Sequence, residues 1–424
     1  MERTYVKDLK HGKNALLKGW VHEIRDLQKV KFLLLRDFSG IVQCVIKNPK
    51  ISISNLTLET VVEIEGKTVK ADVKAELARK DIEVDISSLK ILSKAEKLPM
   101  QVNEKAVTAE LPTRLDYRSL DIRKPRVSAI FKIQSTIANA FREFFYGKGF
   151  TEIQPPEIIA TSTEGGTDLF EVNYFDRKAY LAQSPQLYKQ LAAISLEKVF
   201  LVCPVWRAEK HDTSKHINEI RQMDIEVAFA DDMKIMKYLE ECVQFIVKKV
   251  ISGCKSELEI LDIKLKVPAV KYLTYSEAIA LLNKHGFSLK IGDDFEPEAE
   301  RKLCSIFPNT LIFTYEWPIS MKPFYIWPKN PGKSVSGGFD AVYGGVEISS
   351  GGQRVHVPEI LIKQLKAKGL NLENFKWYID AFRYGAPQHA GWSIGLERIT
   401  QAMLGLDNIR EATLFPRDRR RLTP

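Results

Sequence analysis

The stretch that most constrains the fold is residues 199–229, VFLVCPVWRAEKHDTSKHINEIRQMDIEVAF. Two apolar runs, 199–206 and 223–229, flank a polar loop, which predicts a long antiparallel hairpin. Because side chains alternate along a strand, we expect Arg207 and Glu209 on one face of a sheet. A guanidinium beside a carboxylate suits a nucleotide, with the cation at a phosphate and the carboxylate at the base. The alternative is an ordinary surface ion pair.

The composition is that of a globular chain with room for two or three domains. Hydrophobic and charged residues make up 45% and 28% of 424 residues, which excludes a disordered or membrane-embedded chain. No apolar run could span a bilayer, and the N-terminus lacks a signal-peptide core. The five cysteines are scattered without metal-ligand spacing, so we expect no zinc site and a reducing, cytoplasmic location. The net charge of +9 favours a polyanionic partner.

Residues 1–97 contain five short apolar runs separated by turn signals, with one possible helix at 55–60. Five short strands in so few residues predict a small barrel such as an OB-fold. Within it, Phe32 and Gln43 are a candidate pair, with a ring to stack on a base and an amide to read its edge. The alternative for Phe32 is a place in the barrel core. Residues 98–125 carry three prolines and little periodicity, which indicates a linker that packs on a neighbour.

Residues 126–424 change to helical and mixed patterns. An amphipathic helix is predicted first, from the apolar stripe Ile130, Ile133, Ile137 and Phe141. The strand in FTEIQPPEII is broken by two prolines, so we expect it at a sheet edge or an interface. Residues 255–335 mix helix and strand without a chemical signature, and we interpret them as a small insertion that packs on the sheet.

Polar side chains that could carry chemistry occur in two further segments. In YLAQSPQLYKQLAAI, Gln186 and Lys189 lie three residues apart on one helical face. In GFDAVYGGVEISSGGQRVH, Glu347 and Ser350 offer hard oxygen ligands, and Arg354 adds a fixed cation. Each segment alone is a weak signal, because a Ser/Gly-rich turn also suits an ordinary bulged hairpin.

The last patterned element, AFRYGAPQHAGWSIGLERITQAML, is a strand that enters a helix through a glycine-spaced turn, with Arg398 at the helix start. The sequence contains no Walker A loop, Rossmann fingerprint or nucleophile elbow. A nucleotide site in this chain must therefore be built on an antiparallel sheet.

Three of these segments resemble, in the right order, the three motifs of class II aminoacyl-tRNA synthetases. GFTEIQPPEI resembles motif 1, WRAE with its loop and the strand from Glu219 to Glu226 resembles motif 2, and SIGLER resembles motif 3. A preceding OB-fold is the arrangement of subclass IIb, the aspartyl, asparaginyl and lysyl enzymes. The resemblance covers essentially the whole chain, and the compact length and the ending LFPRDRRRLTP look like the archaeal and eukaryotic aspartyl type.

The resemblance implies an α+β fold in three parts. Residues 1–97 would form a five-stranded OB-fold β-barrel for anticodon binding, and residues 98–125 a hinge. Residues 126–424 would form the class II antiparallel sheet flanked by helices, with the small insertion at about 255–335.

The resemblance also implies a set of site residues, with ATP and Mg²⁺ as cofactors. The ATP-binding positions are Arg207, Glu209, His216, Glu347 and Arg398, with Arg207 and Arg398 catalytic. The aspartate-binding positions are Glu164, Gln186, Lys189, Asp224, Arg354 and His389. The magnesium ligands are Glu347 and Ser350, and the tRNA anticodon contacts are Phe32, Gln43 and His22.

The implied activity is ATP-dependent aspartate–tRNA ligation by a homodimer without a membrane anchor. Two cations, Lys189 and Arg354, would surround the substrate side chain, and a neutral asparagine would leave a desolvated charge unpaired. His22 lies where enzymes that discriminate between tRNAs tend to carry tryptophan. It therefore indicates charging of both tRNA-Asp and tRNA-Asn, and the alternative is an ordinary strand histidine.

Three rival functions remain at this point. An asparaginyl-tRNA synthetase is disfavoured by Lys189, and a tRNA-independent asparagine synthetase is disfavoured by the retained barrel. A catalytically dead RNA-binding protein is disfavoured by Arg207, Glu347 and Arg398, which such a protein would not need.

Overall fold

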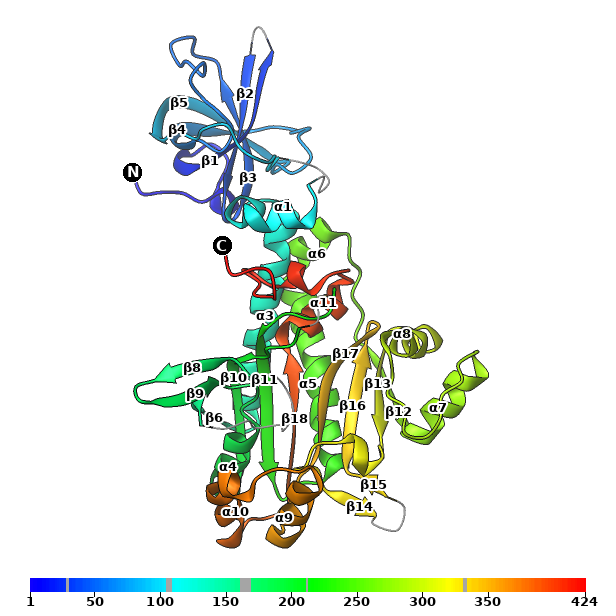
Figure 1. Ribbon diagram of the computed structural model, residues 1–424. Coiled ribbons are helices and arrows are strands. Elements are labelled where there is room, and N and C mark those ends of the chain that lie inside the picture. The colour runs from blue at the N-terminus through cyan, green and yellow to red at the C-terminus, as the bar shows by residue number, and fades with distance from the viewer. Residues whose placement is uncertain (28–29, 104–108, 161–168, 211–212, 331–333) are drawn as a thin grey trace. The chain divides into compact units, whose positions relative to one another are not determined.

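Figure 1 shows the computed structural model, in which the chain forms two compact units, Met1–Lys124 and Pro125–Pro424. The structure describes residues 1–27, 30–103, 109–160, 169–210, 213–330 and 334–424. The described part of the segment expected as a linker therefore falls almost entirely in the N-terminal unit.

The N-terminal unit is built on a closed five-stranded barrel with strand order β1-β2-β3-β5-β4. The strands are β1 (Asn14–Leu27), β2 (Val30–Asp37), β3 (Gly40–Ile46), β4 (Val61–Lys70) and β5 (Ile82–Ser93). Alternate residues of β2 and β3, such as Leu33, Leu35 and Val42, fill the barrel core. The predicted OB-fold barrel is confirmed. The possible helix at 55–60 is wrong, because these residues form two turns that lead into β4.

Two short helices, α1 (Leu111–Asp116) and α2 (Arg118–Asp121), complete the first unit. After these helices in the sequence, Arg123 donates a hydrogen bond of 3.0 Å to Glu59, a buried carboxylate just before β4. Charge-assisted hydrogen bonds of this kind are stronger than neutral ones, so this segment is fastened to the barrel.

The C-terminal unit is built on an eight-stranded sheet with order β12-β13-β16-β17-β18-β11-β10-β6. Its strands are β6 (Thr151–Glu152), β10 (Lys198–Trp206), β11 (Glu219–Ala228), β12 (Ala269–Thr274), β13 (Thr310–Tyr315), β16 (Gly338–Tyr343), β17 (Val346–Gln353) and β18 (His389–Gly395). The six central strands pair antiparallel, and the outer strands β12 and β6 pair parallel with their neighbours. The predicted antiparallel sheet is confirmed.

The predicted central hairpin is confirmed, since β10 and β11 pair along their whole lengths, from Lys198 opposite Val227 to Trp206 opposite Glu219. Strand alternation does not place Arg207 and Glu209, however. That expectation is wrong because β10 ends at Trp206, so both residues lie in the loop beyond the strand.

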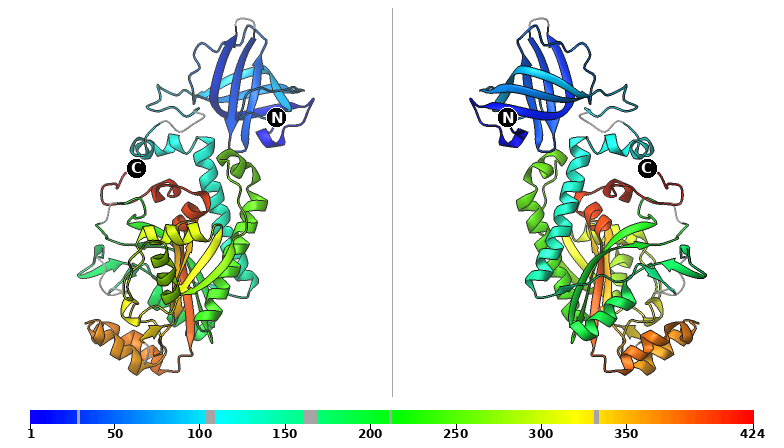
Figure 2. Two further views of the ribbon diagram at one scale, coloured as in Figure 1. Left: turned by 90° about the vertical axis from the view of Figure 1, so that its right-hand side faces the viewer. Right: turned by 90° about the vertical axis from the view of Figure 1, so that its left-hand side faces the viewer.

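Helices α3 (Pro125–Gly147) and α5 (Asp232–Gly253) cover one face of this sheet (Figure 2). The predicted stripe on α3 is confirmed, because its members are all buried in the shared core: Ile130, Ile133, Ile137 and Phe141. The further helices are α4 (Gln186–Leu196), α6 (Lys255–Leu261), α7 (Tyr275–Lys284), α8 (Pro297–Ile306), α9 (Pro358–Ala367), α10 (Lys376–Arg383) and α11 (Leu396–Leu404). No helix in the described residues is long and apolar enough to cross a membrane.

Strand β6, which precedes the two prolines, is an edge strand of the main sheet, as expected. Beyond them, β7 (Ile158–Ile159) joins a separate three-stranded sheet with β9 (Arg177–Leu181) and β8 (Glu171–Tyr174). Residues 255–335 do more than pack on the main sheet, because β12 and β13 are two of its strands. The remaining strands, β14 (Pro328–Asn330) and β15 (Val335–Ser336), form a small ribbon.

Candidate active site

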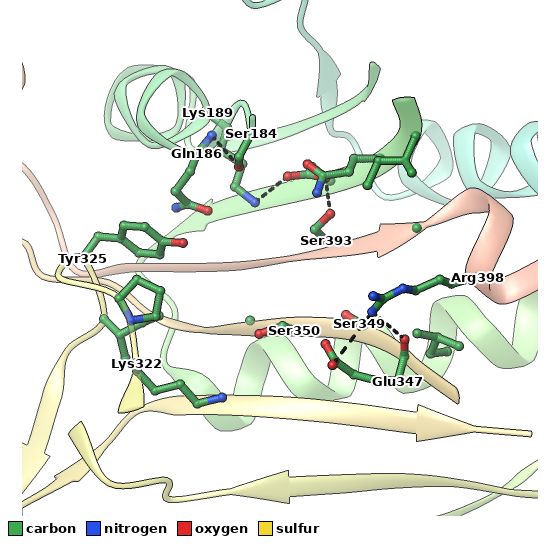
Figure 3. A pocket seen from close by; sticks show the side chains of 18 of the residues that line it. Ser184, Gln186, Lys189, Lys322, Tyr325, Glu347, Ser349, Ser350, Ser393 and Arg398 are labelled. Atoms are coloured by element: carbon green, nitrogen blue, oxygen red, sulfur yellow. Dashed lines mark hydrogen bonds and ion pairs between the residues drawn. The ribbon is translucent and has the colours of Figure 1, made fainter. Parts of the chain in front are cut away.

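A polar cavity of about 280 Å³ lies on the sheet face opposite α3 and α5 (Figure 3). Strand alternation explains its polarity: along β11, Met223 and Ile225 point into the core, while Gln222 and Asp224 line the cavity. Helix α4 closes one side, and the segment 322–326 closes another.

Gln186 and Lys189 reach this cavity from one face of α4, as their spacing predicted. Lys189 is 1% exposed, and its Nζ lies 2.8 Å from Asp224 Oδ2 and 3.6 Å from Glu226 Oε2. The backbone oxygen of Trp392 accepts a third contact from Nζ at 3.2 Å. Lys189 is therefore held between two carboxylates at the buried end of the cavity.

Arg354 completes this group from the end of β17. Its Nε donates to Glu226 Oε1 at 2.9 Å and its Nη2 to Oε2 at 3.3 Å. Glu226 thus joins the two cations, Lys189 and Arg354, that the sequence places near the substrate side chain. Removing one member of such a buried network leaves an uncompensated charge, at a cost of roughly 3–5 kcal/mol. We call these four residues, Lys189, Asp224, Glu226 and Arg354, the charge network.

A glycine makes room for the charge network. A side chain at Gly391 would lie 2.1 Å from Glu226 Oε2 and 2.3 Å from the backbone oxygen of Ile225. Two residues further along β18, Ser393 donates a 2.6 Å hydrogen bond to Asp224 Oδ1. Strand β18 therefore leaves space for one carboxylate and orients the other.

His389 lies behind the charge network and does not line the cavity. Its Nδ1 is 2.9 Å from the backbone oxygen of Pro387, so Nδ1 carries the proton and Nε2 accepts from Gln190 Nε2 at 2.9 Å. Burial lowers the pKa of His389 to about 4, so the ring is neutral at physiological pH. Gln190 also accepts a hydrogen bond from Gln186, which lines the cavity. His389 thus connects to the cavity through two glutamines.

The other end of the cavity carries Arg398, Glu347 and Ser350 (Figure 3), and Arg207 also lines the cavity. Strand β17 has one extra residue between Glu347 and Ser349, opposite Ala341 and Val342 of β16. This bulge lets the side chains of Glu347 and Ser350, which are three residues apart, both reach the cavity. Arg398 Nη1 donates to the backbone oxygen of Glu347 at 3.2 Å and lies 3.9 Å from its Oε2.

Glu347 stands near a second carboxylate, Asp340, which accepts a 2.6 Å hydrogen bond from Lys322. Burial and the charge of Asp340 raise the pKa of Glu347 to about 7. Two carboxylates and the hydroxyl of Ser350 are hard oxygen donors, which fits Mg²⁺ as the sequence predicts. A dication here would relieve the repulsion that raises this pKa.

Three buried polar atoms around the cavity have no hydrogen-bond partner within the described residues. They are Arg207 Nε, Gln222 Oε1 and Ser349 Oγ. Buried polar atoms are nearly always paired in folded proteins, so these atoms mark where a ligand or water completes the site.

Three other predicted positions lie apart from this cavity or outside the description. Glu209 lines a second cavity of about 480 Å³ with Trp206 and Lys210. His216 lies in the loop between β10 and β11, where its Nδ1 is 2.6 Å from Thr213 Oγ1. Glu164 falls outside the described residues. Their roles stay predictions.

In the barrel, Phe32 and Gln43 share the outer face of β2 and β3. Phe32 pairs with Val45, and Gln43 pairs with Leu34 two residues along, so all four side chains point away from the barrel core. The alternative of a core position for Phe32 is therefore wrong. Gln43 Nε2 donates to Glu83 Oε2 at 2.9 Å, which fixes the amide on this face.

His22 is buried, with 2% of its surface exposed. Its Nδ1 lies 3.0 Å from Arg36 Nη1, and Arg36 pairs with Glu59 through two hydrogen bonds of 2.7 and 2.6 Å. Burial and the charge of Arg36 lower the pKa of His22 to about 4. A direct anticodon contact by His22 does not fit this buried position, and an effect of His22 on tRNA choice stays a prediction.

Sequence reasoning missed several residues that shape the cavity. Glu226 was detectable, since Gln222, Asp224 and Glu226 recur every second residue in an apolar strand. Lys322 and Tyr325 line the cavity from the segment that showed no chemical signature. Nothing local distinguishes them, because the fold alone brings that segment to the site.

The closed barrel and the antiparallel sheet with its charged cavity agree with two family models. The family model for class II tRNA synthetases (D, K and N) matches residues 110–419, and that for the OB-fold nucleic acid binding domain matches residues 15–92. The chain belongs to the class II tRNA synthetases.

Individual relatives agree along the full length. The aspartate–tRNA(Asp/Asn) ligase of Methanopyrus kandleri is 44% identical, with all of both chains covered. The aspartate–tRNA(Asp) ligase of Thermoplasma volcanium is 43% identical, also over all of both chains. Among solved structures, the asparaginyl-tRNA synthetase of Pyrococcus horikoshii with asparaginyl-adenylate has a TM-score of 0.93 at 34% identity, with all of both chains covered.

The buried carboxyl of Glu397, next to Arg398, generates a prediction about pH. It accepts a hydrogen bond from the Arg221 backbone N–H at 3.1 Å, and burial raises its pKa from 4.5 to about 7. A carboxyl whose pKa is raised by folding favours the folded state below the unfolded pKa, and this advantage is lost as pH rises to about 7. Glu397→Gln should remove this pH-dependent loss in the free energy of unfolding, which amounts to about 3 kcal/mol for such a pKa shift.

Denaturant unfolding at pH 5 and pH 8 measures this effect. We expect Glu397→Gln to match the wild type at pH 5 and to be more stable by about 2–3 kcal/mol at pH 8. Glu298→Gln, at an exposed position of α8, is the control and should show no pH-dependent difference. The same difference at both pH values for Glu397→Gln would contradict the prediction.

Proposed function

We propose that this chain is an ATP-dependent aspartate–tRNA ligase, with ATP and Mg²⁺ at the cavity and tRNA-Asp as acceptor. The observation that carries the proposal is the charge network at the amino-acid end of the cavity. The full-length relatives named aspartate–tRNA ligase support it. Their names differ on tRNA-Asn as a second acceptor, so that acceptor belongs in the same assay.

The charge balance of the cavity favours aspartate. The cavity lining carries more cations than carboxylates: Lys189, Arg207, Lys322, Arg354 and Arg398 against Asp224 and Glu347. The side-chain carboxylate of aspartate would form charge-assisted hydrogen bonds with Lys189 and Arg354, whereas the amide of asparagine brings no charge to these cations. The excess of cations therefore favours aspartate, although the asparaginyl enzyme of Pyrococcus horikoshii has a similar fold.

The positions of these groups support a division of labour in the first reaction. The α-carboxylate of aspartate attacks the α-phosphorus of ATP in line, a phosphorus–oxygen bond forms, and pyrophosphate leaves. Arg207, with its unpaired Nε, would stabilise the charge that builds on the phosphoryl oxygens. Arg398 would lie against the adenine, and Asp224 would accept hydrogen bonds from the substrate ammonium group. No nucleophilic side chain is needed.

Glu347, Ser350 and Asp340 are the residues that would hold Mg²⁺, which supplies charge neutralisation at the phosphates. In the second reaction, the 3′-hydroxyl of the terminal tRNA ribose attacks the carbonyl carbon of the mixed anhydride, and AMP leaves. The aspartyl ester therefore forms on the tRNA. The outer face of β2 and β3, with Phe32 and Gln43, would bind the anticodon.

A homodimer is part of this proposal. Strand β6 has two residues at the open edge of the main sheet, and Tyr146 and Ile158 nearby in the chain are 56% and 50% exposed. An open edge with apolar neighbours favours burial by a partner, and a second copy would cover it. The expected cytoplasmic location agrees with the five cysteines, which are all free.

Aminoacylation of tRNA-Asp and tRNA-Asn transcripts with radiolabelled aspartate, and with asparagine in parallel, tests the function. We expect aspartate on tRNA-Asp. Additional aspartate on tRNA-Asn would define a ligase with two acceptors. Asparagine on tRNA-Asn without any aspartate transfer would overturn the proposal.

The charge network predicts that Lys189→Leu loses affinity for aspartate and keeps its affinity for ATP. The KM for aspartate in ATP–pyrophosphate exchange should rise by at least about 100-fold, because one buried charge pair is worth about 3 kcal/mol. The KM for ATP should stay within about threefold, since the phosphate end is intact. Lys178→Leu is the control, because Lys178 makes an exposed ion pair on β9. Circular dichroism establishes that both variants fold, and equal rises in both KM values would refute the assigned role.

The barrel face predicts a different kinetic signature. Phe32→Ala and Gln43→Ala should each raise the KM for tRNA-Asp by about 5- to 100-fold, the range expected for one base-stacking or base-reading contact. Pyrophosphate exchange, which needs no tRNA, should not change. Phe38→Ala, at an exposed aromatic position beyond β2, is the control. A tRNA KM that stays at the wild-type value in both variants would place the anticodon elsewhere.

A further inference from the structure

The insertion contributes one charged contact to the loop of the central hairpin. Lys215, in the loop between β10 and β11, places its Nζ 2.9 Å from Glu300 Oε2 on helix α8. The side chains are 19% and 12% exposed, so water is largely excluded from the pair. Exposed ion pairs contribute little because solvent screens them, and this pair is shielded from that loss.

Helix α8 has a fixed position from which to hold Glu300. Its apolar side packs Ala299 and Leu303 into a small core with residues of α7 and β13. Its other side meets the turn between β16 and β17, where a side chain at Gly345 would lie 3.2 Å from Arg301 Cγ. This turn leads directly to Glu347. Helix α8 therefore packs against the turn that leads to the phosphate end of the cavity.

The opposite side of the same loop is fastened by the C-terminal segment. Ile409 N–H donates to the Ser214 oxygen at 2.8 Å, and Asn218 N–H donates to the Arg417 oxygen at 2.7 Å. Arg410 Nη1 donates to the Thr213 oxygen at 3.0 Å. These contacts fix the backbone of residues 213–218 from one side. The Lys215–Glu300 pair adds a side-chain contact from the insertion.

We infer that Glu300 is a positioning residue for ATP: through Lys215 it holds residues 213–218, and Asn218 in this segment hydrogen-bonds to Arg207, which lines the cavity. The inference rests on the proposed function, because it assigns ATP to this cavity. It gives the insertion a part in the reaction that its sequence does not indicate. Glu300 itself touches no substrate. Its effect passes through the geometry of the loop, and ordered loops bind ligands at a lower entropic cost.

ATP–pyrophosphate exchange with Glu300→Gln tests this inference, because the amide keeps the shape and loses the charge. We expect the KM for ATP to rise by about 3- to 10-fold, the range of one shielded ion pair, with the KM for aspartate within twofold. Lys215→Met should behave alike, and the double variant should be no worse than the worse single variant. Glu300→Asp should recover part of the ATP affinity. Glu298→Gln, on an exposed position of the same helix, should match the wild type.

Two results would overturn the inference. An unchanged KM for ATP in Glu300→Gln, with a lower melting temperature, would make the pair a contributor to stability alone. Equal rises in the KM values for ATP and aspartate would indicate a general disturbance of the cavity. Exchange is run with aspartate, asparagine and lysine, so that a wrong substrate assignment is recognised separately. Equilibrium dialysis of ATP against the wild type and Glu300→Gln decides the inference if no amino acid supports exchange.

Discussion

The buried charge network of Lys189, Asp224, Glu226 and Arg354 is the interaction on which the rest of the catalytic unit depends. Its members come from α4, β11 and the end of β17, and their pairing fixes these elements relative to one another. A network of this kind is a weak source of stability, because desolvation offsets most of the Coulomb attraction. Its value is specificity: two cations are desolvated in fixed positions before a substrate arrives, so binding need not order them.

In the proposed function the two ends of the cavity differ in their charge pairing. At the end assigned to the amino acid, the members of the charge network are all paired, which suits recognition of a zwitterion by exchange of partners. At the phosphate end, Arg207 Nε has no partner within the described residues, and Glu347 has its pKa raised to about 7. Unsatisfied groups of this kind are costly in an empty protein and favourable when charge builds on a phosphoryl group. In the proposed reaction, charge would build at this end of the cavity.

Local periodicity made much of the fold predictable. The hairpin, the stripe on α3 and the barrel strands follow from patterns of a few residues, and the family motifs placed Lys189, Arg207 and Arg398 at one cavity. What could not be predicted depends on contacts distant in sequence. Arg354 meets Glu226 across 128 residues, and that pairing changed two apparently free cations into members of a balanced network. The end of β10 at Trp206 could not be predicted either, because an apolar run does not show where strand pairing stops.

The barrel unit also contains a buried carboxylate that is paired with cations. Glu59 is buried between Arg36 and Arg123, and Arg36 in turn contacts His22, so a buried carboxylate again holds two cations. With its pKa lowered to about 4, His22 stays neutral and cannot act as a charge toward RNA. By strand alternation Arg36 lies on the same outer face of β2 as Phe32, while Leu33 and Leu35 fill the barrel core. This ion group therefore lies on the face on which Phe32 and Gln43 are proposed to contact the anticodon.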